Sequence, residues 1–189
     1  MTKCHVCSML EYAARLSCMS LALVLCLSPL YNPDPTSNHT VSFVMHKSVP
    51  YRLMLTFCVL CMVVFNYWYL SRGLDYVQDL IIKTFSVALV LSWALVIFTE
   101  WGPSHYYASV AFTGLAFAAF AFKLHSTHKR ASGSIEVMLL VLSYMCMALA
   151  LQGALYLIVK SDCSHTAKYA IMEHSMLFHF ALGTTCMQC

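Results

Sequence analysis

Long apolar runs alternate with short polar segments along the whole chain. Six runs reach or approach the roughly 20 residues that a helix needs to cross a lipid bilayer. Segments such as "NPDPTSN" and "HKRASGS" separate the runs, and their Pro, Gly, Asn and Ser residues favour turns. Because a backbone in lipid must satisfy its own hydrogen bonds, we expect helices rather than strands. The six runs occupy about 12–31, 51–70, 80–99, 106–124, 135–159 and 169–187.

The composition strengthens this prediction. Hydrophobic residues make up 60% of the 189 residues and charged residues only 10%, whereas soluble domains carry about 25% charged residues. We therefore predict an all-α protein, a polytopic transmembrane bundle of about six helices that forms one transmembrane domain over residues 1–189. The formal net charge of +3 is spread along the chain, so no nucleic-acid partner is expected.

The positions of Lys and Arg predict the orientation, because cytoplasmic loops carry an excess of these residues. We interpret the first run as a retained span rather than a signal peptide, since Glu11 and Arg15 lie in its charged lead-in. With both termini cytoplasmic, the glycosylation sequon at Asn38 faces the lumen or the exterior, and a chance match is the alternative. The inner basic residues are then Lys3, Arg15, Arg72, Lys83, Lys123, Lys129 and Arg130, and the outer ones are Lys47, Arg52, Lys160 and Lys168.

Ten cysteines occur in the chain. Those within the apolar runs, such as Cys58 and Cys146, are interpreted as small packing residues. Two pairs near the chain ends have the spacing of zinc ligands, and cytoplasmic termini would bring them to one face of the membrane. Juxtamembrane palmitoylation is the alternative for these pairs. We expect no cofactor, and the residues kept as metal candidates are Cys4, Cys7, Cys186 and Cys189.

A polar stretch, "MEHSMLFHFALG", lies within the last apolar run. Ionisable residues within a membrane span are candidates for function. His174 and His179 are five residues apart, so on a helix they point roughly 140° away from each other and do not form a metal-binding pair. We interpret the stretch as a polar packing seam, with contact to lipid or a partner and a metal site as alternatives. Its residues are Glu173, His174 and His179, and His105 and Lys168 are expected close to Glu173.

Small residues recur within the later runs and allow helices to approach closely. The fourth run alternates small residues with Phe, and we predict that it forms a tightly packed central helix. The fifth and sixth runs carry fewer small residues than the fourth, and these also suit close packing between helices. The small residues are Ala108, Ser109, Gly114, Ala118 and Ala119 in the fourth run, Ser143 and Gly153 in the fifth, and Gly183 in the sixth.

Two stretches of the second half, "SHYYASVAFTGLAFAAFAF" and "YAIMEHSMLFHFALG", are similar to a known family. With these stretches, residues 85–185 resemble the Frag/DRAM/Sfk family of six-span membrane proteins. Members have a His near the start of the fourth span and a Glu early in the sixth, which His105 and Glu173 match. The resemblance implies a protein without a metal, associated with lipid remodelling of anchored proteins, phosphoinositide-kinase recruitment, or autophagy and lysosomal regulation.

Two function classes compete. The first is a non-enzymatic multi-pass membrane protein that acts as a scaffold or accessory subunit of a larger membrane complex, or as a lipid-associated regulator. Its partners are membrane lipids and other membrane-protein subunits, in the plasma membrane or a secretory or endolysosomal membrane. The alternative is an intramembrane lipid-modifying enzyme that uses Glu173, His179 and His105 as acid–base groups. An independent channel has less support, because no run carries a row of charges.

Overall fold

The computed structural model describes residues 5–31, 40–70, 76–100, 102–128, 133–160 and 167–186. Within these ranges the chain is entirely helical, which confirms the all-α prediction. Asn38, Cys4, Cys189 and the side chain of Cys7 lie outside the described part. The elements are α1 (His5–Cys26), the 3₁₀ turn η1 (Ser28–Tyr31), α2 (Val41–Lys47), α3 (Val49–Leu70), α4 (Tyr76–Phe98), α5 (Pro103–His128), α6 (Ser134–Val159) and α7 (Ala167–Cys186).

Among the described residues, four helices are long and apolar enough to cross a membrane, namely α3, α4, α5 and α6. In α1 the apolar stretch Tyr12–Cys26 is shorter. These helices give the chain the features of a membrane protein. The short helix α2 is an element that the hydrophobic pattern did not predict, because seven residues are too few to show a helical periodicity. Thr40 caps α2 by accepting a hydrogen bond from the N–H of Phe43 at 3.1 Å.

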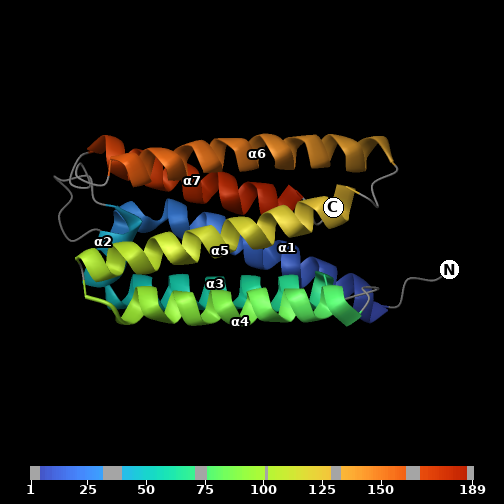
Figure 1. Cartoon of the computed structure of the whole chain (residues 1–189), viewed down its shortest axis with the longest axis horizontal. Coiled ribbons are helices and arrows are strands. Elements are labelled where there is room, and N and C mark those ends of the chain that lie inside the picture. Colours follow the sequence, from blue (N-terminus) through green and yellow to red (C-terminus); the bar gives the residue numbers. More distant parts are fainter. Residues whose placement is uncertain are drawn as a thin grey trace.

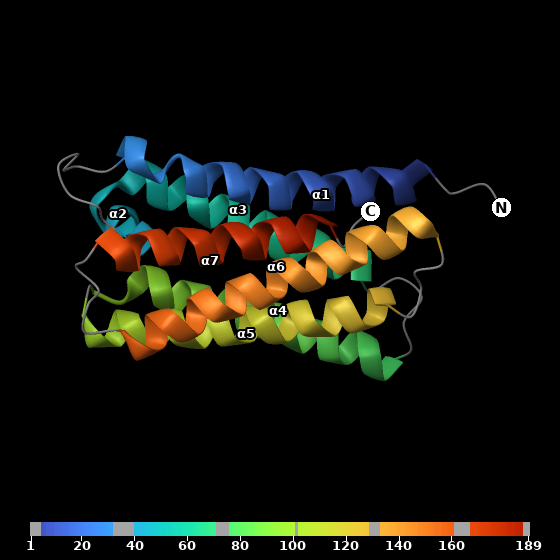
Figure 2. The same cartoon turned by 90° about the horizontal axis from the view of Figure 1, so that it is seen from above.

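The six long helices run along one common axis and alternate in direction (Figures 1 and 2). As a result, α1 begins and α7 ends at the same end of the bundle, and α2 lies at the opposite end, beside the start of α7. We call this opposite end the α2 end. The most extensive packing joins α6 to α7, α1 to α3 and α4 to α5, whereas α5 and α6 contact each other much less.

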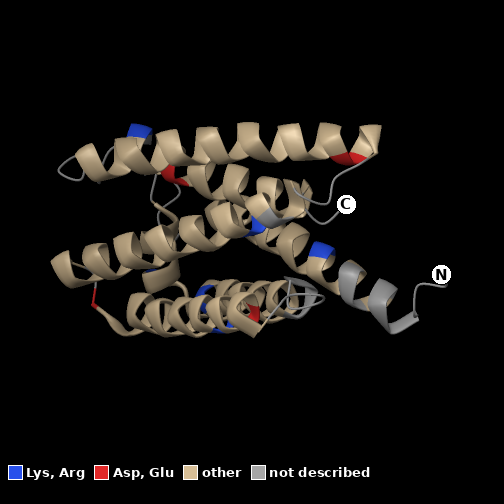
Figure 3. Ribbon diagram, turned by 45° about the vertical axis from the view of Figure 1, so that its right-hand side comes forward, with Lys and Arg blue, Asp and Glu red and all other residues tan. Residues whose placement is uncertain are grey.

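Apolar side chains cover the outside of the bundle as well as its core. Phe57, Phe98 and Val159 are 69%, 84% and 73% exposed. Most of the ribbon carries no charged residue, as Figure 3 shows. A contiguous apolar exterior of this kind is unfavourable in water and is the surface that a lipid bilayer covers. The outer face of the helices therefore agrees with the membrane assignment.

The predicted small-residue packing is confirmed between α6 and α7. A Cβ atom added to Gly153 would lie 2.9 Å from Cβ of Met176, and one added to Gly183 would lie 3.0 Å from Cβ of Cys146. The prediction fails for Gly114 in α5, where an added Cβ would meet no atom within 4 Å. Gly114 and Ala118 are exposed. Gly114 and Ala118 therefore leave an open space toward α6, whereas Ala108 is buried in the core and Ala119 packs against it, as predicted.

Candidate functional site

Glu173 connects α7 to the start of α2. Its side chain is 9% exposed, and its carboxylate accepts a hydrogen bond from the N–H of Val41 at 2.6 Å and another from the hydroxyl of Ser42 at 2.9 Å. Hydrogen bonds to a carboxylate are stronger than those between neutral groups, and they satisfy a backbone N–H that the first turn of a helix leaves unpaired. Glu173 thus fixes α2 over the interior of the bundle.

His174 connects α7 to the segment that follows α1. Its Nδ1 lies 2.7 Å from the carbonyl oxygen of Ala170, and its Nε2 lies 2.5 Å from Oγ of Ser28. A carbonyl only accepts, so Nδ1 carries the proton and Nε2 accepts the hydrogen bond that the Ser28 hydroxyl donates. Ser28 is 1% exposed. Of the two tautomers of a neutral ring, the hydrogen-bonding geometry of His174 fits the one with the proton on Nδ1.

His105, in α5, faces His46 of α2. Nδ1 of His105 lies 3.1 Å from the carbonyl oxygen of Val96 and 3.0 Å from Nε2 of His46, so it donates toward both acceptors. The hydroxyl of Ser109 donates to the other nitrogen of His105 at 3.3 Å. Burial lowers the pKa of His46, and the nearby charge of Arg52 lowers it further. His46 is therefore harder to protonate than a free histidine, which keeps its Nε2 available as an acceptor for His105.

The sequence-predicted residues do not converge on one catalytic centre. Glu173 binds α2 rather than His105 or Lys168, and the ammonium of Lys168 lies 5.5 Å from the ring centre of Tyr156. His179 hydrogen bonds within its own helix, with Nδ1 2.7 Å from the carbonyl oxygen of Ser175. His174 and His179 have separate partners, as their spacing predicted. Among the described residues, no three His, Cys, Asp or Glu side chains gather as metal ligands, and Cys186 is buried.

A second polar cluster, which sequence reasoning missed, surrounds Lys123 in α5. This lysine is 3% exposed, although its position near the end of an apolar run indicated a loop-proximal charge. Its ammonium donates to Oδ1 of Asn66 at 2.5 Å and lies 3.5 Å from the carbonyl oxygen of Thr184. The amide of Asn66 donates to the carbonyl of Met62 at 2.7 Å. An asparagine inside an otherwise apolar run was the signal available in the sequence.

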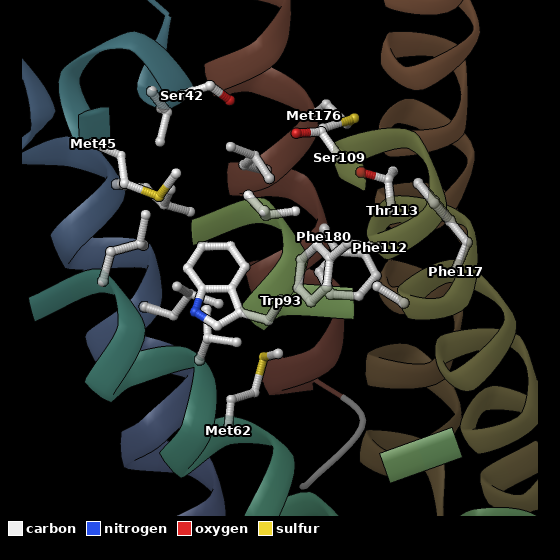
Figure 4. Close-up of a pocket in the computed structure, with 18 residues that line it drawn as sticks. Ser42, Met45, Met62, Trp93, Ser109, Phe112, Thr113, Phe117, Met176 and Phe180 are labelled. Atoms are coloured by element: carbon white, nitrogen blue, oxygen red, sulfur yellow. The ribbon is translucent and has the colours of Figure 1, made fainter. Parts of the chain in front are cut away.

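A cavity of about 100 Å³ lies within the bundle beneath α2. Its lining is mostly apolar, and the exceptions are the hydroxyl groups of Ser42, Ser109 and Thr113 and the indole of Trp93. Figure 4 shows the three hydroxyl residues toward the α2 end and Trp93 near the middle. The indole of Trp93 packs against Phe112 with ring centres 5.0 Å apart. All the long helices except α6 contribute to the lining. We call this space the central cavity.

A larger crevice of about 250 Å³ lies between α5, α6 and α7. Gly114 lies in its lining, which explains why this glycine has no close neighbour. The crevice shares four lining residues with the central cavity, so only one layer of side chains separates the two spaces. These residues are Ser109, Thr113, Phe117 and Met176. We call it the α5–α6 crevice.

Comparison of the chain with protein-family models, curated proteins and solved structures gives no match. The resemblance to Frag/DRAM/Sfk proteins therefore stays a prediction. The site itself consists of polar contacts at the α2 end and two neighbouring apolar spaces.

Proposed function

We propose that this protein is a lipid-associated regulator, a multi-pass membrane protein that crosses the bilayer six times with both termini cytoplasmic. The alternating directions of the six long helices support an even number of crossings (Figure 2). In this topology the α2 end faces the lumen or the exterior. α1 and α7 cross beside the four more apolar helices, and Glu173 and His174 of α7 hydrogen bond to α2 and to Ser28 in η1.

The observation that carries the proposal is the α5–α6 crevice. A cavity of about 150 Å³ with a lining of Leu, Ile and Phe binds benzene, and the crevice offers about 250 Å³. Two of its three walls belong to α5 and α6, which are apolar enough to span a membrane, and Tyr169 and Met176 of α7 complete the lining. An acyl chain of a bilayer lipid is the occupant with the matching chemistry. The hydroxyls of Ser109 and Thr113 lie where the crevice meets the central cavity.

Photo-crosslinking tests this proposal directly. The tagged chain is reconstituted in phosphatidylcholine bilayers that contain a phospholipid with a diazirine on its acyl chain, and the crosslinked residues are mapped by mass spectrometry. We expect crosslinks at crevice residues such as Val110, Gly114 and Leu155. Equal labelling of Phe57 on the outer face, with no enrichment in the crevice, would contradict a lipid site.

Purification from the native membrane in mild detergent tests the alternative role as an accessory subunit. Gly114 and Ala118 are exposed with the spacing of a small-residue helix contact, so a partner helix is the competing occupant of the same face. A stoichiometric membrane protein that crosslinks to these residues would replace the lipid assignment. A retained phospholipid without such a partner would support it.

A further inference from the structure

Ser28 and His174 have the arrangement of a nucleophile and its base. Activation of a serine needs a base within hydrogen-bond reach and a third group that orients the base. Here Oγ of Ser28 lies 2.5 Å from Nε2 of His174, and the carbonyl of Ala170 holds Nδ1 at 2.7 Å. We propose that Ser28 is a catalytic nucleophile that attacks carboxylic esters, with His174 as its general base. His174 was among the candidate site residues that the sequence indicated, whereas Ser28 was not.

Tyr51 gives independent support to this site. The residue is fully buried at 0% exposure, and among the described residues its hydroxyl makes no hydrogen bond of good geometry although it lies beside Ser28. A buried hydroxyl without a partner is costly, and such groups occur where a ligand completes the hydrogen bonding. A donor next to a nucleophile is suited to stabilise the oxyanion of an acyl-transfer intermediate.

The position of the pair relative to the central cavity indicates the substrate class. Leu21 and Leu25 of α1 line the cavity, and Ser28 follows Leu25 by one turn. α2 covers the same end, with Val41 and Ser42 in the cavity lining. Ser28 does not itself line the cavity, so the cavity provides the apolar surroundings of the pair, which favour an ester with an apolar acyl group. The assignment of a lipid ester as substrate rests on the proposed lipid binding, whereas the nucleophile rests on the hydrogen bonds alone.

The reaction is the hydrolysis of an ester. Oγ of Ser28 bonds to the carbonyl carbon, its proton passes to Nε2 of His174, and the carbonyl electron pair moves to an oxyanion that accepts a hydrogen bond from Tyr51. Collapse breaks the ester C–O bond, and the alcohol leaves with the proton from His174. Water then attacks the acyl-serine, gives its proton to Nε2, and releases the carboxylic acid and the free Ser28 hydroxyl.

The test is active-site labelling of the wild-type chain in bilayers with an alkyl fluorophosphonate, whose chain partitions into lipid. Intact mass and peptide mapping locate the adduct. We expect a single adduct on Ser28 and slower labelling in competition with a long-chain monoacylglycerol. A folded chain, monodisperse on size-exclusion chromatography, that acquires no adduct on Ser28 during prolonged exposure would overturn the proposal.

Matched variants separate chemistry from folding. His174→Gln should slow labelling at least tenfold, whereas His179→Gln, which alters a histidine bonded only within its own turn, should leave the rate unchanged. Tyr51→Phe should slow labelling several-fold, and Tyr76→Phe, at an exposed position, serves as its control. Equal rates in all four variants would overturn the roles of His174 and Tyr51, and fluorescence melting curves verify that each variant is folded.

Labelling of Ser28 and crosslinking in the α5–α6 crevice test two hypotheses, and either one can be refuted without the other. An adduct on Ser28 without acyl crosslinks in the α5–α6 crevice would keep the nucleophile and refute the proposed lipid site. Crosslinks in the crevice without an adduct on Ser28 would do the reverse. Labelling of Ser92, a buried serine that hydrogen bonds only to Leu89 within its helix at 3.0 Å, would show that the reagent does not discriminate. The nucleophile would then be refuted.

Discussion

The two sides of α6 use small residues in opposite ways. Toward α7, Gly153 allows the backbones to approach until an added Cβ would lie 2.9 Å from Met176. The hydroxyl of Ser143 also donates across this interface to the carbonyl of Gly183 at 3.2 Å. Toward α5, Gly114 faces an open crevice of about 250 Å³. Small residues thus create a close contact on one side and an empty volume on the other.

The difference between the α6–α7 and α5–α6 sides means that a pattern of small residues alone does not identify a packed interface. Without a hydrophobic driving force between helices in lipid, association depends on van der Waals fit and hydrogen bonds. The α6–α7 interface has both, because Gly153 fits Met176 and Ser143 reaches across. The α5–α6 side lacks this fit, so its small residues are available to a lipid chain or another helix. Mutations can test whether the two sides differ as described.

The largest loss of stability is expected from Gly153→Leu, at the α6–α7 interface. The added side chain meets Cβ of Met176, which cannot move without the backbone of α7, and overpacking costs about 1–3 kcal/mol or more. The apparent melting temperature in detergent, followed by tryptophan fluorescence, should fall clearly. Gly114→Leu is the matched control on the open side and should change it little. An equal fall in melting temperature in both variants would contradict the difference in packing between the α6–α7 and α5–α6 sides.

The variant Glu173→Ala tests whether the α6–α7 interface depends on steric fit alone. The variant leaves the N–H of Val41 and the hydroxyl of Ser42 without their carboxylate, and buried donors that lose a partner cost about 1–3 kcal/mol. We expect a smaller fall in melting temperature than for Gly153→Leu, with faster hydrogen exchange confined to α2 and the start of α7. Faster exchange along all of α6 would show instead that the polar attachment holds the α6–α7 interface together.

The helical architecture could be predicted from the sequence, because long apolar runs and turn-forming segments are local signals. The packing role of Gly153 and Gly183 also followed from composition within the runs. The empty space beside Gly114 did not, since it depends on how far apart α5 and α6 lie. Likewise, α2 escaped prediction because its order derives from a tertiary contact, the carboxylate of Glu173.

The candidate site was predicted in part. Glu173, His174 and His105 stood out as polar residues in apolar runs, and the structure gives each of them a specific buried or half-buried partner. Those partners could not be identified from the sequence, because a backbone N–H has no sequence signature and Ser28 is an ordinary serine before a proline. Their pairing joins residues 146 positions apart, which only the fold determines.

Gly114→Leu should affect lipid binding more than stability. The new side chain extends into the α5–α6 crevice, whose mouth then narrows, while no neighbour within 4 Å of its Cβ must move. We expect acyl-chain crosslinking at Leu155 to fall several-fold and the melting temperature to stay close to that of the wild type. Val87→Ala on the outer face of α4 is the control for general bilayer contact. Undiminished crosslinking in Gly114→Leu would exclude the crevice as the lipid site.

The smallest effect is expected from pH, through the contact that holds the start of α5 against α2. Burial, together with Arg52 and Lys47, lowers the pKa of His46, so the folded protein binds a proton at this ring less readily than the unfolded chain. The contribution of His46 to stability is therefore constant above about pH 6.5, the value of an unperturbed histidine, and decreases as the pH falls below it. Protonation of His46 would also remove one of the two acceptors of Nδ1 of His105, the other being the carbonyl of Val96.

Melting curves between pH 8 and pH 5 measure this dependence, and hydrogen exchange locates it. Because His105 belongs to α5, acidification should increase exchange at the start of α5, on the open side of α6, before it affects the α6–α7 interface. His46→Gln should flatten the pH dependence, whereas His125→Gln, at an exposed position, should leave it unchanged. A slope that persists in His46→Gln would assign the titration to another group, and the attachment of α5 would then not depend on the charge of His46.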